Sequence, residues 1–327
     1  EFSSPATQHY GHFRRTGERM APLRITFETA QLDADLINAT AIKAYLNDTL
    51  HNAKTWLESA FSVTPVEGNL FAQPTCNGYW LPDKIKCGLA ASSTTCGRRT
   101  VPGAYLDSLP IYSIDPSGST LVVASTSPQG IGAADTDLLV FVTMQDDGGT
   151  CAPGGGTIAY AGTCQRDQND RPVVGHVNFC PHQLTQVPTD ARDIEGDLAV
   201  AIHELMHIVG FSSASFPLYR EADGTPRTAR CPDADGCTDS DWPGLPRIVS
   251  GQHYVDPATV AVSDERGVAG VKRLVTPEVR NAARDHFECD TLAGAEIENG
   301  GGSGTAGSHF EQRTLFTELM TGQMSPI

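Results

Sequence analysis

The hydrophobic and polar positions along the chain predict a mixed set of strands and helices. Residues 22–30 alternate apolar and polar side chains, which predicts a half-buried strand. Apolar residues near helical spacing predict one or two helices over residues 33–62. The continuous apolar run from residue 136 to residue 144 predicts a central, buried strand. Two more strands are predicted over residues 157–164 and 173–179, with a polar turn between them.

A long helix is predicted next, from a cap at Thr189 or Asp190 to Val209. Its apolar positions recur at helical spacing along one stripe, at Ile194, Leu198, Ile202, Leu205 and Val209. Gly210 follows, and glycine is the usual residue just past a helix end.

Two long segments show little periodicity. Residues 72–118 are rich in Cys, Gly, Pro, Ser and Thr, which predicts a loop region held by disulfides. Residues 212–285 also read as loop-rich, with a further helix predicted over residues 271–286. A glycine-rich run lies between Ile297 and Ser308.

Charge and length exclude some classes of partner. The chain has 327 residues, enough for two domains, and a formal net charge of −16. This charge argues against nucleic acid or an anionic membrane as the main partner. The sequence contains no apolar run of the roughly 18 residues that a membrane span needs. We therefore expect attachment to a membrane only through an anchor outside this chain.

The cysteines indicate an oxidising compartment. There are nine of them, without a Cys-x-x-Cys pair, so a thiolate zinc site is not expected. Their positions in Gly/Pro-rich stretches favour disulfides, with Cys231 and Cys237 as one expected pair. Two sequons, at Asn38 and Asn47, predict glycosylation. Together these features predict an extracellular protein, either secreted or on the cell surface.

The chemistry centres on the segment His203-Glu204-Leu205-Met206-His207 of the long predicted helix. Residues four apart lie one turn above each other on a helix, so both imidazoles can bind one metal ion. Zinc lowers the pKa of a bound water toward about 7. Glu204 can then take the proton of that water as general base and pass it to a leaving amine. The motif therefore predicts hydrolysis by a metal-activated water.

The identity of the third metal ligand is open at this point. A catalytic zinc ion needs three protein ligands and one open position. Gly210 stands three residues after His207, as in the HExxHxxGxxH signature of metzincins, but Ser213 occupies the third histidine position. The ligand must come from further on. The candidates are the later carboxylates and three histidines, His253, His286 and His309. A glutamate ligand would indicate a thermolysin-like peptidase.

Three stretches resemble the leishmanolysin family of surface metallopeptidases, which are metzincins with a long insertion before the third histidine. Residues 158–178 resemble the family's strands before the active-site helix, and residues 203–212 resemble the helix and its glycine. Residues 286–320 join an acidic and glycine-rich segment to Ser308-His309 and to Glu318-Leu319-Met320. Together the three stretches cover much of residues 136–327.

The resemblance implies a fold and a ligand set. It implies that His309 is the third zinc ligand and that Met320 is the Met-turn methionine, which packs beneath the metal. The implied fold is α+β and metzincin-like. Residues 1–211 would hold a twisted mixed sheet and the active-site helix, and residues 212–327 a loop-rich second subdomain. The family's cysteine-rich C-terminal region is expected to be missing from this chain.

The resemblance also implies a function. One catalytic Zn²⁺ would serve an endopeptidase that cleaves proteins or peptides. A substrate would add as an antiparallel strand to a sheet edge formed by Ile158, Ala159, Tyr160 and Ala161. An alternative of another class is a catalytically silent zinc-binding surface or matrix protein on the same fold. The intact motif residues argue against this alternative.

Overall fold

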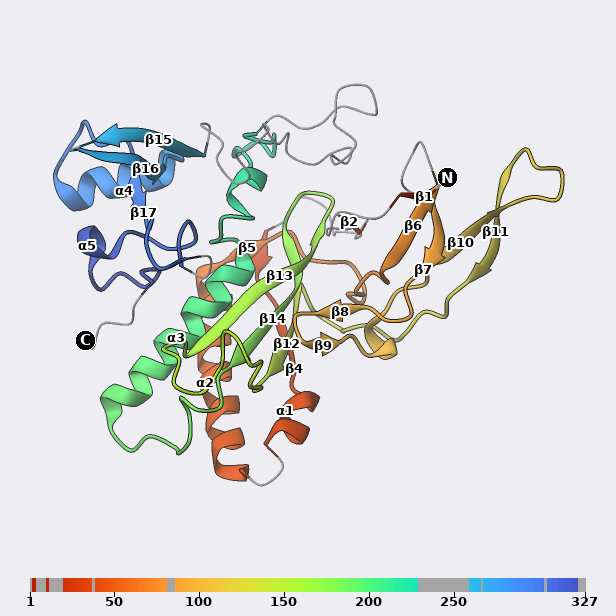
Figure 1. Ribbon diagram of the computed structural model, residues 1–327, viewed down its shortest axis with the longest axis horizontal. Helices are drawn as coiled ribbons and strands as arrows, with labels where there is room; N and C mark the ends of the chain where they lie inside the picture. The colour runs from red at the N-terminus through yellow and green to blue at the C-terminus, as the bar shows by residue number, and fades with distance from the viewer. Residues whose placement is uncertain are drawn as a thin grey trace. The chain divides into compact units, whose positions relative to one another are not determined.

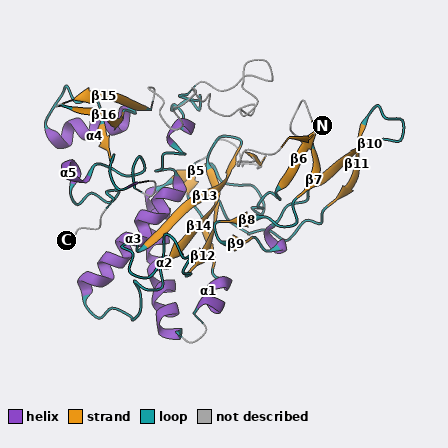
Figure 2. Ribbon diagram, viewed as in Figure 1, coloured by secondary structure: helices purple, strands orange, loops and turns teal. Residues whose placement is uncertain are grey.

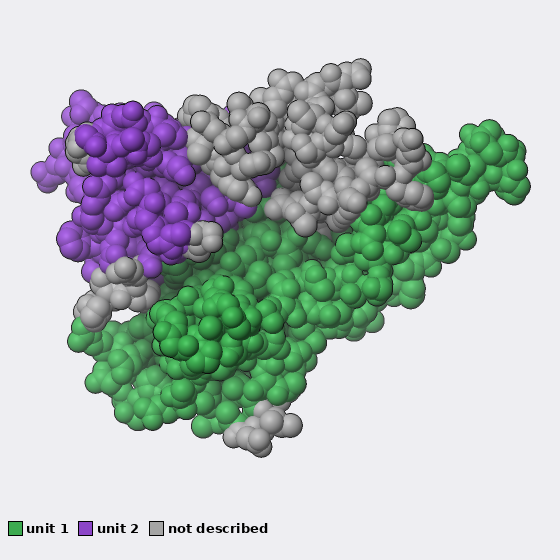
Figure 3. All heavy atoms as spheres, in the orientation of Figure 1, with its two compact units in different colours: residues 1–209 green, residues 210–327 purple. Residues whose placement is uncertain are grey.

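The computed structural model describes residues 2–3, 10–11, 20–36, 39–80, 86–228, 259–265, 267–302 and 305–322. The chain divides into two compact units, residues 1–209 and residues 210–327 (Figure 3). Each unit has its own sheets and helices.

A mixed five-stranded sheet forms the centre of the first unit (Figure 1). Its order is β2-β13-β14-β12-β4, and its strands are β2 (Tyr10–Gly11), β13 (Ala159–Asp167), β14 (Pro172–Phe179), β12 (Leu138–Thr143) and β4 (Ile25–Glu28). All six residues of β12 are buried. This strand is parallel to both β14 and β4, which explains its continuous apolar sequence. The predicted strands over residues 136–144, 157–164 and 173–179 are confirmed.

Three helices accompany this sheet, α1 (Ala30–Asp35), α2 (Thr40–Ala60) and α3 (Ala191–Val209). The buried residues of α2 recur at helical spacing, at Leu46, Thr49, Leu50, Ala53 and Leu57. Helix α3 packs against α2, β13 and β14. On the opposite side of the sheet, Phe141 and Val174 belong to a core that includes Val66 and Leu70.

A second five-stranded sheet corrects the expectation of a loop region over residues 72–118. Its order is β1-β6-β7-β10-β11, and its strands are β1 (Phe2–Ser3), β6 (Cys76–Trp80), β7 (Cys87–Ala90), β10 (Pro110–Ile114) and β11 (Leu121–Thr126). The pairing of β6 with β7 shifts register on both sides of Gly78, so these short strands carry no regular alternation in sequence. A disulfide between Cys76 and Cys87 joins them.

Smaller elements complete the first unit. Two short antiparallel pairs are present, and the first joins β3 (Ala21–Pro22) to β5 (Ser62–Val63). The second joins β8 (Thr95–Cys96) to β9 (Arg99–Thr100), and a 3-10 turn, η1, spans Gly103–Tyr105.

The described part of the second unit contains an antiparallel sheet, β15-β16-β17, together with helices α4 and α5 (Figure 2). Its elements are η2 (Phe216–Leu218), β15 (Val260–Glu265), β16 (Val268–Leu274), α4 (Pro277–Phe287), β17 (Ala295–Ile297) and α5 (Gln312–Leu315). The predicted helix over residues 271–286 is therefore wrong in its first part. Pro277 occupies the first turn of α4, where proline is tolerated, and the residues before it continue β16.

Ion pairs link the strands of the second unit to one another and to α5. Arg273 and Glu296 are both buried and pair with each other. Arg273 also pairs with the partly exposed Glu265, and Glu296 pairs with the exposed side chain of Arg313. Within the described residues, no helix combines the length and the apolar character that crossing a bilayer would require.

Candidate active site

Helix α3 carries the motif and begins as its sequence predicts. Asp190 Oδ1 accepts a hydrogen bond of 2.8 Å from the Arg192 main-chain nitrogen, so Asp190 is the N-cap. The predicted apolar stripe holds in the second half, where Ile202 and Leu205 are buried, and fails at Ile194, which is 41% exposed. The first turns of the helix therefore lie at the surface, and its C-terminal half is deep in the fold.

His203 and His207 lie one turn apart on this buried half, and their ring nitrogens converge. The two Nε2 atoms are 3.1 Å apart, and the rings are perpendicular. A tetrahedral zinc ion with Zn–N bonds of about 2.0–2.1 Å holds two nitrogen ligands about 3.4 Å apart. The two side chains are thus arranged as a pair of ligands for one metal ion.

Glu204, between these histidines in sequence, has a buried carboxylate with an unused oxygen. Its Oε2 atom is buried and accepts no hydrogen bond from the described residues. Burial raises the pKa of the Glu204 carboxyl to about 8. A buried carboxylate without a partner is costly. A metal ion held by the neighbouring histidines would lower that pKa, and a water molecule could satisfy the unused oxygen.

The end of α3 is fixed from both sides of Val209. Thr163 in β13 donates a hydrogen bond of 2.8 Å from its hydroxyl to the carbonyl oxygen of Ile208. Gly210 has a φ of 138°, a conformation that favours glycine. The Tyr219 hydroxyl donates to the Gly210 carbonyl oxygen at 3.1 Å. The chain can therefore turn sharply directly after the helix.

His309, in the second unit, is held in one tautomer. Its Nδ1 lies 2.9 Å from the Thr305 carbonyl oxygen, which can only accept, so Nδ1 carries the proton. In this tautomer Nε2 is the ring nitrogen that carries the lone pair, as in a histidine that binds a metal ion through Nε2. Burial lowers the pKa of His309, although the Thr305 carbonyl and the charge of Glu298 act in the opposite direction. The neutral imidazole is the form that binds metals.

Contacts within the second unit connect His309 to the segment that follows α3. The rings of Phe211 and Phe310 pack with centroids 4.7 Å apart. The Ser213 main-chain nitrogen donates to Ser308 Oγ at 3.2 Å. Ser308 and Phe310, on either side of His309, therefore contact the short segment that follows α3.

Met320 is buried in the same unit, with 2% of its surface exposed. Its carbonyl oxygen accepts a hydrogen bond of 2.8 Å from the Phe310 main-chain nitrogen. Its own main-chain nitrogen donates to Glu318 Oε2 at 2.6 Å. Met320 is thereby fixed next to the residue that follows His309.

Comparison with known proteins shows the family of this chain. The family model for leishmanolysin matches residues 119–230 and 252–326, which is more than half of the chain. The chain belongs to the leishmanolysin family. It is 31% identical to the leishmanolysin-like peptidase of Caenorhabditis elegans over 326 residues, covering 93% of this chain and 46% of that protein.

Two other relatives extend this similarity. The leishmanolysin-like peptidase of Drosophila melanogaster is 31% identical over 85% of this chain and 41% of its own length. The ciliated left-right organizer metallopeptidase of Xenopus laevis is 28% identical over 86% of this chain and 35% of its own. The chain thus spans less than half the length of these curated relatives.

In this leishmanolysin-family chain, strand β13 has one side that is largely unpaired among the described residues. Residues 159–163 of β13 pair with β14. On the other side of β13, the described pairing with β2 is confined to Arg166 and Asp167. Within the described residues, Ile158, Ala159, Tyr160 and Ala161 therefore present a sheet edge with no neighbouring strand.

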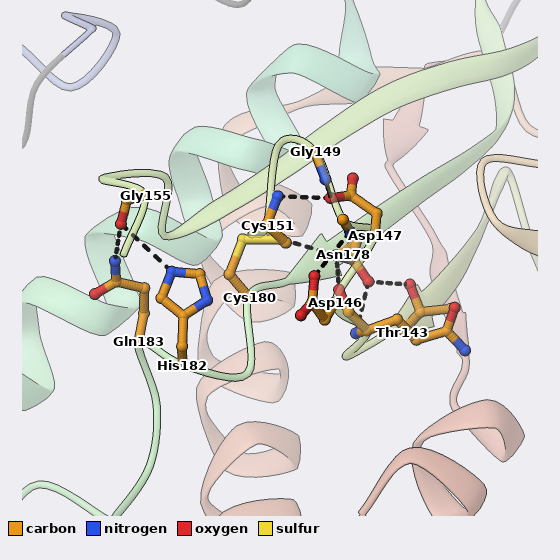
Figure 4. Close-up of a disulfide and its surroundings, with 12 residues drawn as sticks. Thr143, Asp146, Asp147, Gly149, Cys151, Gly155, Asn178, Cys180, His182 and Gln183 are labelled. Atoms are coloured by element: carbon orange, nitrogen blue, oxygen red, sulfur yellow. Dashed lines mark hydrogen bonds between the residues drawn. A yellow bond between two sulfur atoms is a disulfide. The ribbon is translucent and has the colours of Figure 1, made fainter. Parts of the chain in front are cut away.

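A disulfide and a buried amide fix the start of this edge. Cys151 is bonded to Cys180 (Figure 4). The Cys180 main-chain nitrogen donates to the Ile158 carbonyl oxygen at 2.9 Å. Asn178 is fully buried beside the disulfide, and its Oδ1 accepts hydrogen bonds from the Thr143 hydroxyl and the Gln145 main-chain nitrogen. The loop before the edge strand is thereby tied to the end of β14.

The cysteines, the two sequon asparagines and the other late histidines were also singled out in the sequence. A third disulfide, Cys96–Cys164, brings the described disulfides to three, and Cys289 has no disulfide partner among the described residues. Asn47 lies half-buried on α2, and His286 is exposed at the end of α4. The sequon residue Asn38, the expected disulfide pair Cys231 and Cys237, and the candidate ligand His253 lie outside the described residues.

Sequence reasoning did not find two residues that hold the candidate ligands. Thr163 fixes the last turn of α3, and Thr305 holds the ring of His309. Both act through long-range or main-chain hydrogen bonds. No local pattern in the sequence identifies such partners.

Proposed function

We propose that this leishmanolysin-family chain is a zinc-dependent endopeptidase in which His203, His207 and His309 bind the metal. The observation that carries the proposal is the pair of converging Nε2 atoms of His203 and His207, next in sequence to a buried carboxylate with an unused oxygen. The tautomer of His309 and its connection to the segment after α3 support its assignment as third ligand.

Glu204 is proposed as the general base. A bound Zn²⁺ supplies Lewis acidity, which lowers the pKa of a water molecule and polarises a carbonyl group. Glu204, a buried side chain, would accept the proton of the attacking water at Oε2, the oxygen without a hydrogen-bond partner among the described residues. The same oxygen then donates the proton to the leaving amine.

Met320 and Gly210 are proposed as structural parts of the site. Met320, as the Met-turn residue, packs below the ligands without binding the ion, which agrees with its full burial and with its link to Phe310. Gly210 provides the turn after the helix, which agrees with its positive φ.

The substrate is proposed to be a protein or peptide in extended form. The unpaired edge at residues 158–161 offers main-chain groups to an antiparallel strand. Such binding depends on backbone hydrogen bonds, so it requires little of the substrate sequence. The described disulfides support an extracellular location, either secreted or on a cell surface. Glycosylation at Asn47 remains a prediction consistent with that location.

The function is tested by incubating the purified chain with a denatured protein and following its fragmentation. We expect internal cleavage that a chelator abolishes and that added zinc restores. A chain that contains zinc but produces no fragments from several denatured proteins would contradict the endopeptidase assignment. It would favour the zinc-binding surface or matrix protein.

A further inference from the structure

We propose that Thr305 is a positioning residue for His309, and that Gly322 is required because it leaves space for the Thr305 side chain. The proposal depends on the proposed function in one respect, that His309 is a zinc ligand. Every contact that carries it lies within the second unit.

The backbone of Thr305 orients the imidazole ring directly. Its carbonyl oxygen accepts the Nδ1 proton of His309 at 2.9 Å. Histidine ligands of metal ions commonly donate their second ring N–H to a carbonyl or carboxylate, which fixes both the tautomer and the ring plane. A displacement of this carbonyl would therefore rotate the ring or remove its hydrogen bond.

The turn that contains Thr305 is closed by main-chain hydrogen bonds. The nitrogens of Thr305 and Ala306 both donate to the Gly302 carbonyl oxygen, at 3.2 and 2.9 Å. The Glu298 main-chain carbonyl oxygen accepts from the Gly307 nitrogen, and the Glu298 main-chain nitrogen donates to the His309 carbonyl oxygen, each at 2.8 Å. These bonds fix the main chain of Thr305 and of the residues up to His309 against Gly302 and Glu298.

The side chain of Thr305 lies between two glycines. A Cβ atom at Gly322 would lie 2.4 Å from Thr305 Cγ2, and a Cβ atom at Gly301 would lie 2.8 Å from Thr305 Cβ. These distances are too short for carbon atoms, so a side chain at either glycine would force Thr305 to move. The threonine side chain is branched at Cβ and has few alternative rotamers.

Gly322 is the better position for a test, because its backbone accepts other residues. Gly301 has a φ of 78°, which already disfavours a side chain, whereas Gly322 has no positive φ. The added Cβ at Gly322 would meet the His309 ring only at an ordinary distance, 3.5 Å from Cγ. The clash of Gly322→Ala is thus specific to the Thr305 methyl group.

The test measures the zinc affinity of the full chain by competition with a chelator. We expect Gly322→Ala to weaken zinc binding about tenfold, the range found when an outer partner of a metal ligand is disturbed. Gly322→Ala combined with Thr305→Ser, which removes the clashing methyl group, should recover most of the affinity. Gly196→Ala is the control, because no atom lies within 4 Å of the added Cβ.

A second readout does not depend on zinc. Nitrogen NMR of the metal-free protein reports the His309 Nδ1–H resonance, which should move in Gly322→Ala and return in the double variant. Unchanged affinity and an unchanged resonance in Gly322→Ala would overturn the proposal. Losses that Thr305→Ser does not restore would overturn the role of Thr305. If His309→Ala keeps full zinc affinity, the proposed ligand set is wrong, and the resonance alone decides whether Thr305 positions the ring.

Discussion

Thr163 Oγ1 donates a hydrogen bond of 2.8 Å to the carbonyl oxygen of Ile208. This bond joins the strand that offers the open sheet edge to the last turn of the helix that carries His203 and His207. It therefore fixes the candidate substrate strand against the candidate metal ligands, and it satisfies a carbonyl that the helix end leaves without an intrahelical partner.

Replacing Thr163 by valine should destabilise the protein. Valine keeps the shape of the side chain but leaves the Ile208 carbonyl without its donor, which costs about 1–2 kcal/mol of unfolding free energy. Denaturant unfolding measures the change. Thr126→Val, at an exposed position of β11, is the control and should change stability by less than about 0.5 kcal/mol. Equal effects of the two substitutions would show that the hydrogen bond contributes nothing.

Replacing Glu204 by glutamine should separate metal binding from catalysis. The amide has nearly the same shape but cannot accept a proton, so zinc should stay bound while kcat falls about 10²–10⁴-fold. Zinc content and peptide hydrolysis are measured on the same sample. Glu195→Gln, at an exposed position of α3, should leave both unchanged. Normal turnover by Glu204→Gln would rule out Glu204 as the base.

The close contact of α3 with the sheet depends on Gly175. A Cβ atom there would lie 2.3 Å from Ile208 Cγ2 and 3.1 Å from the Gly162 carbonyl oxygen. We expect Gly175→Ala to lower stability by about 1–3 kcal/mol, the usual cost of overpacking a core. Gly196→Ala, in open space on the same helix, should instead raise it by about 0.5–1 kcal/mol. Thermal unfolding of both variants tests whether stability changes in opposite directions. A Gly175→Ala protein as stable as the wild type would refute the tight packing of α3 on the sheet.

The stability of the fold should depend on pH through His176. Burial lowers the pKa of its imidazole to about 4, from an ordinary value of 6.5, beside the Cys96–Cys164 disulfide and the ring of Tyr160. As the pH falls, His176 therefore takes up its proton in the unfolded chain before it does so in the folded chain. Its contribution to the free energy of unfolding is complete above about pH 6.5 and is lost as the pH falls toward 4. The loss should reach up to about 3 kcal/mol.

Unfolding free energies measured from pH 7 to pH 4 test this dependence. In His176→Gln the slope with pH should be smaller over that range, whatever its absolute stability. His51→Gln, at an exposed position of α2, is the control and should keep the wild-type slope. Equal slopes in His176→Gln and the wild type would contradict the buried neutral imidazole.

The sequence predicted the elements that have strong periodicity and missed those that do not. The buried strand β12 and the helix α3 follow directly from a continuous apolar run and from a capped helical repeat. The sheet between residues 76 and 126 was missed because its strands are short and interrupted by register shifts. The exposed Ile194 shows that periodicity alone does not determine where a helix leaves the core.

The candidate site was predicted to different depths. The spacing of His203 and His207 on a helix was sufficient to predict converging nitrogens, because helical geometry is local. Spacing could not choose His309 over other late ligands, and only the family resemblance favoured it. The His309 ring is held by a hydrogen bond to a main-chain carbonyl oxygen. Because every residue has such a carbonyl, the residue type at position 305 could not predict this bond.

The most direct test of the account is the zinc content of His309→Ala after dialysis, compared with the wild type and with His286→Ala. His286 is exposed on α4 and should be dispensable. We expect about one zinc ion per chain in the wild type and in His286→Ala, and almost none in His309→Ala. A His309→Ala protein that retains its zinc would contradict the proposed ligand set and would direct the search to a carboxylate, as in thermolysin-like peptidases.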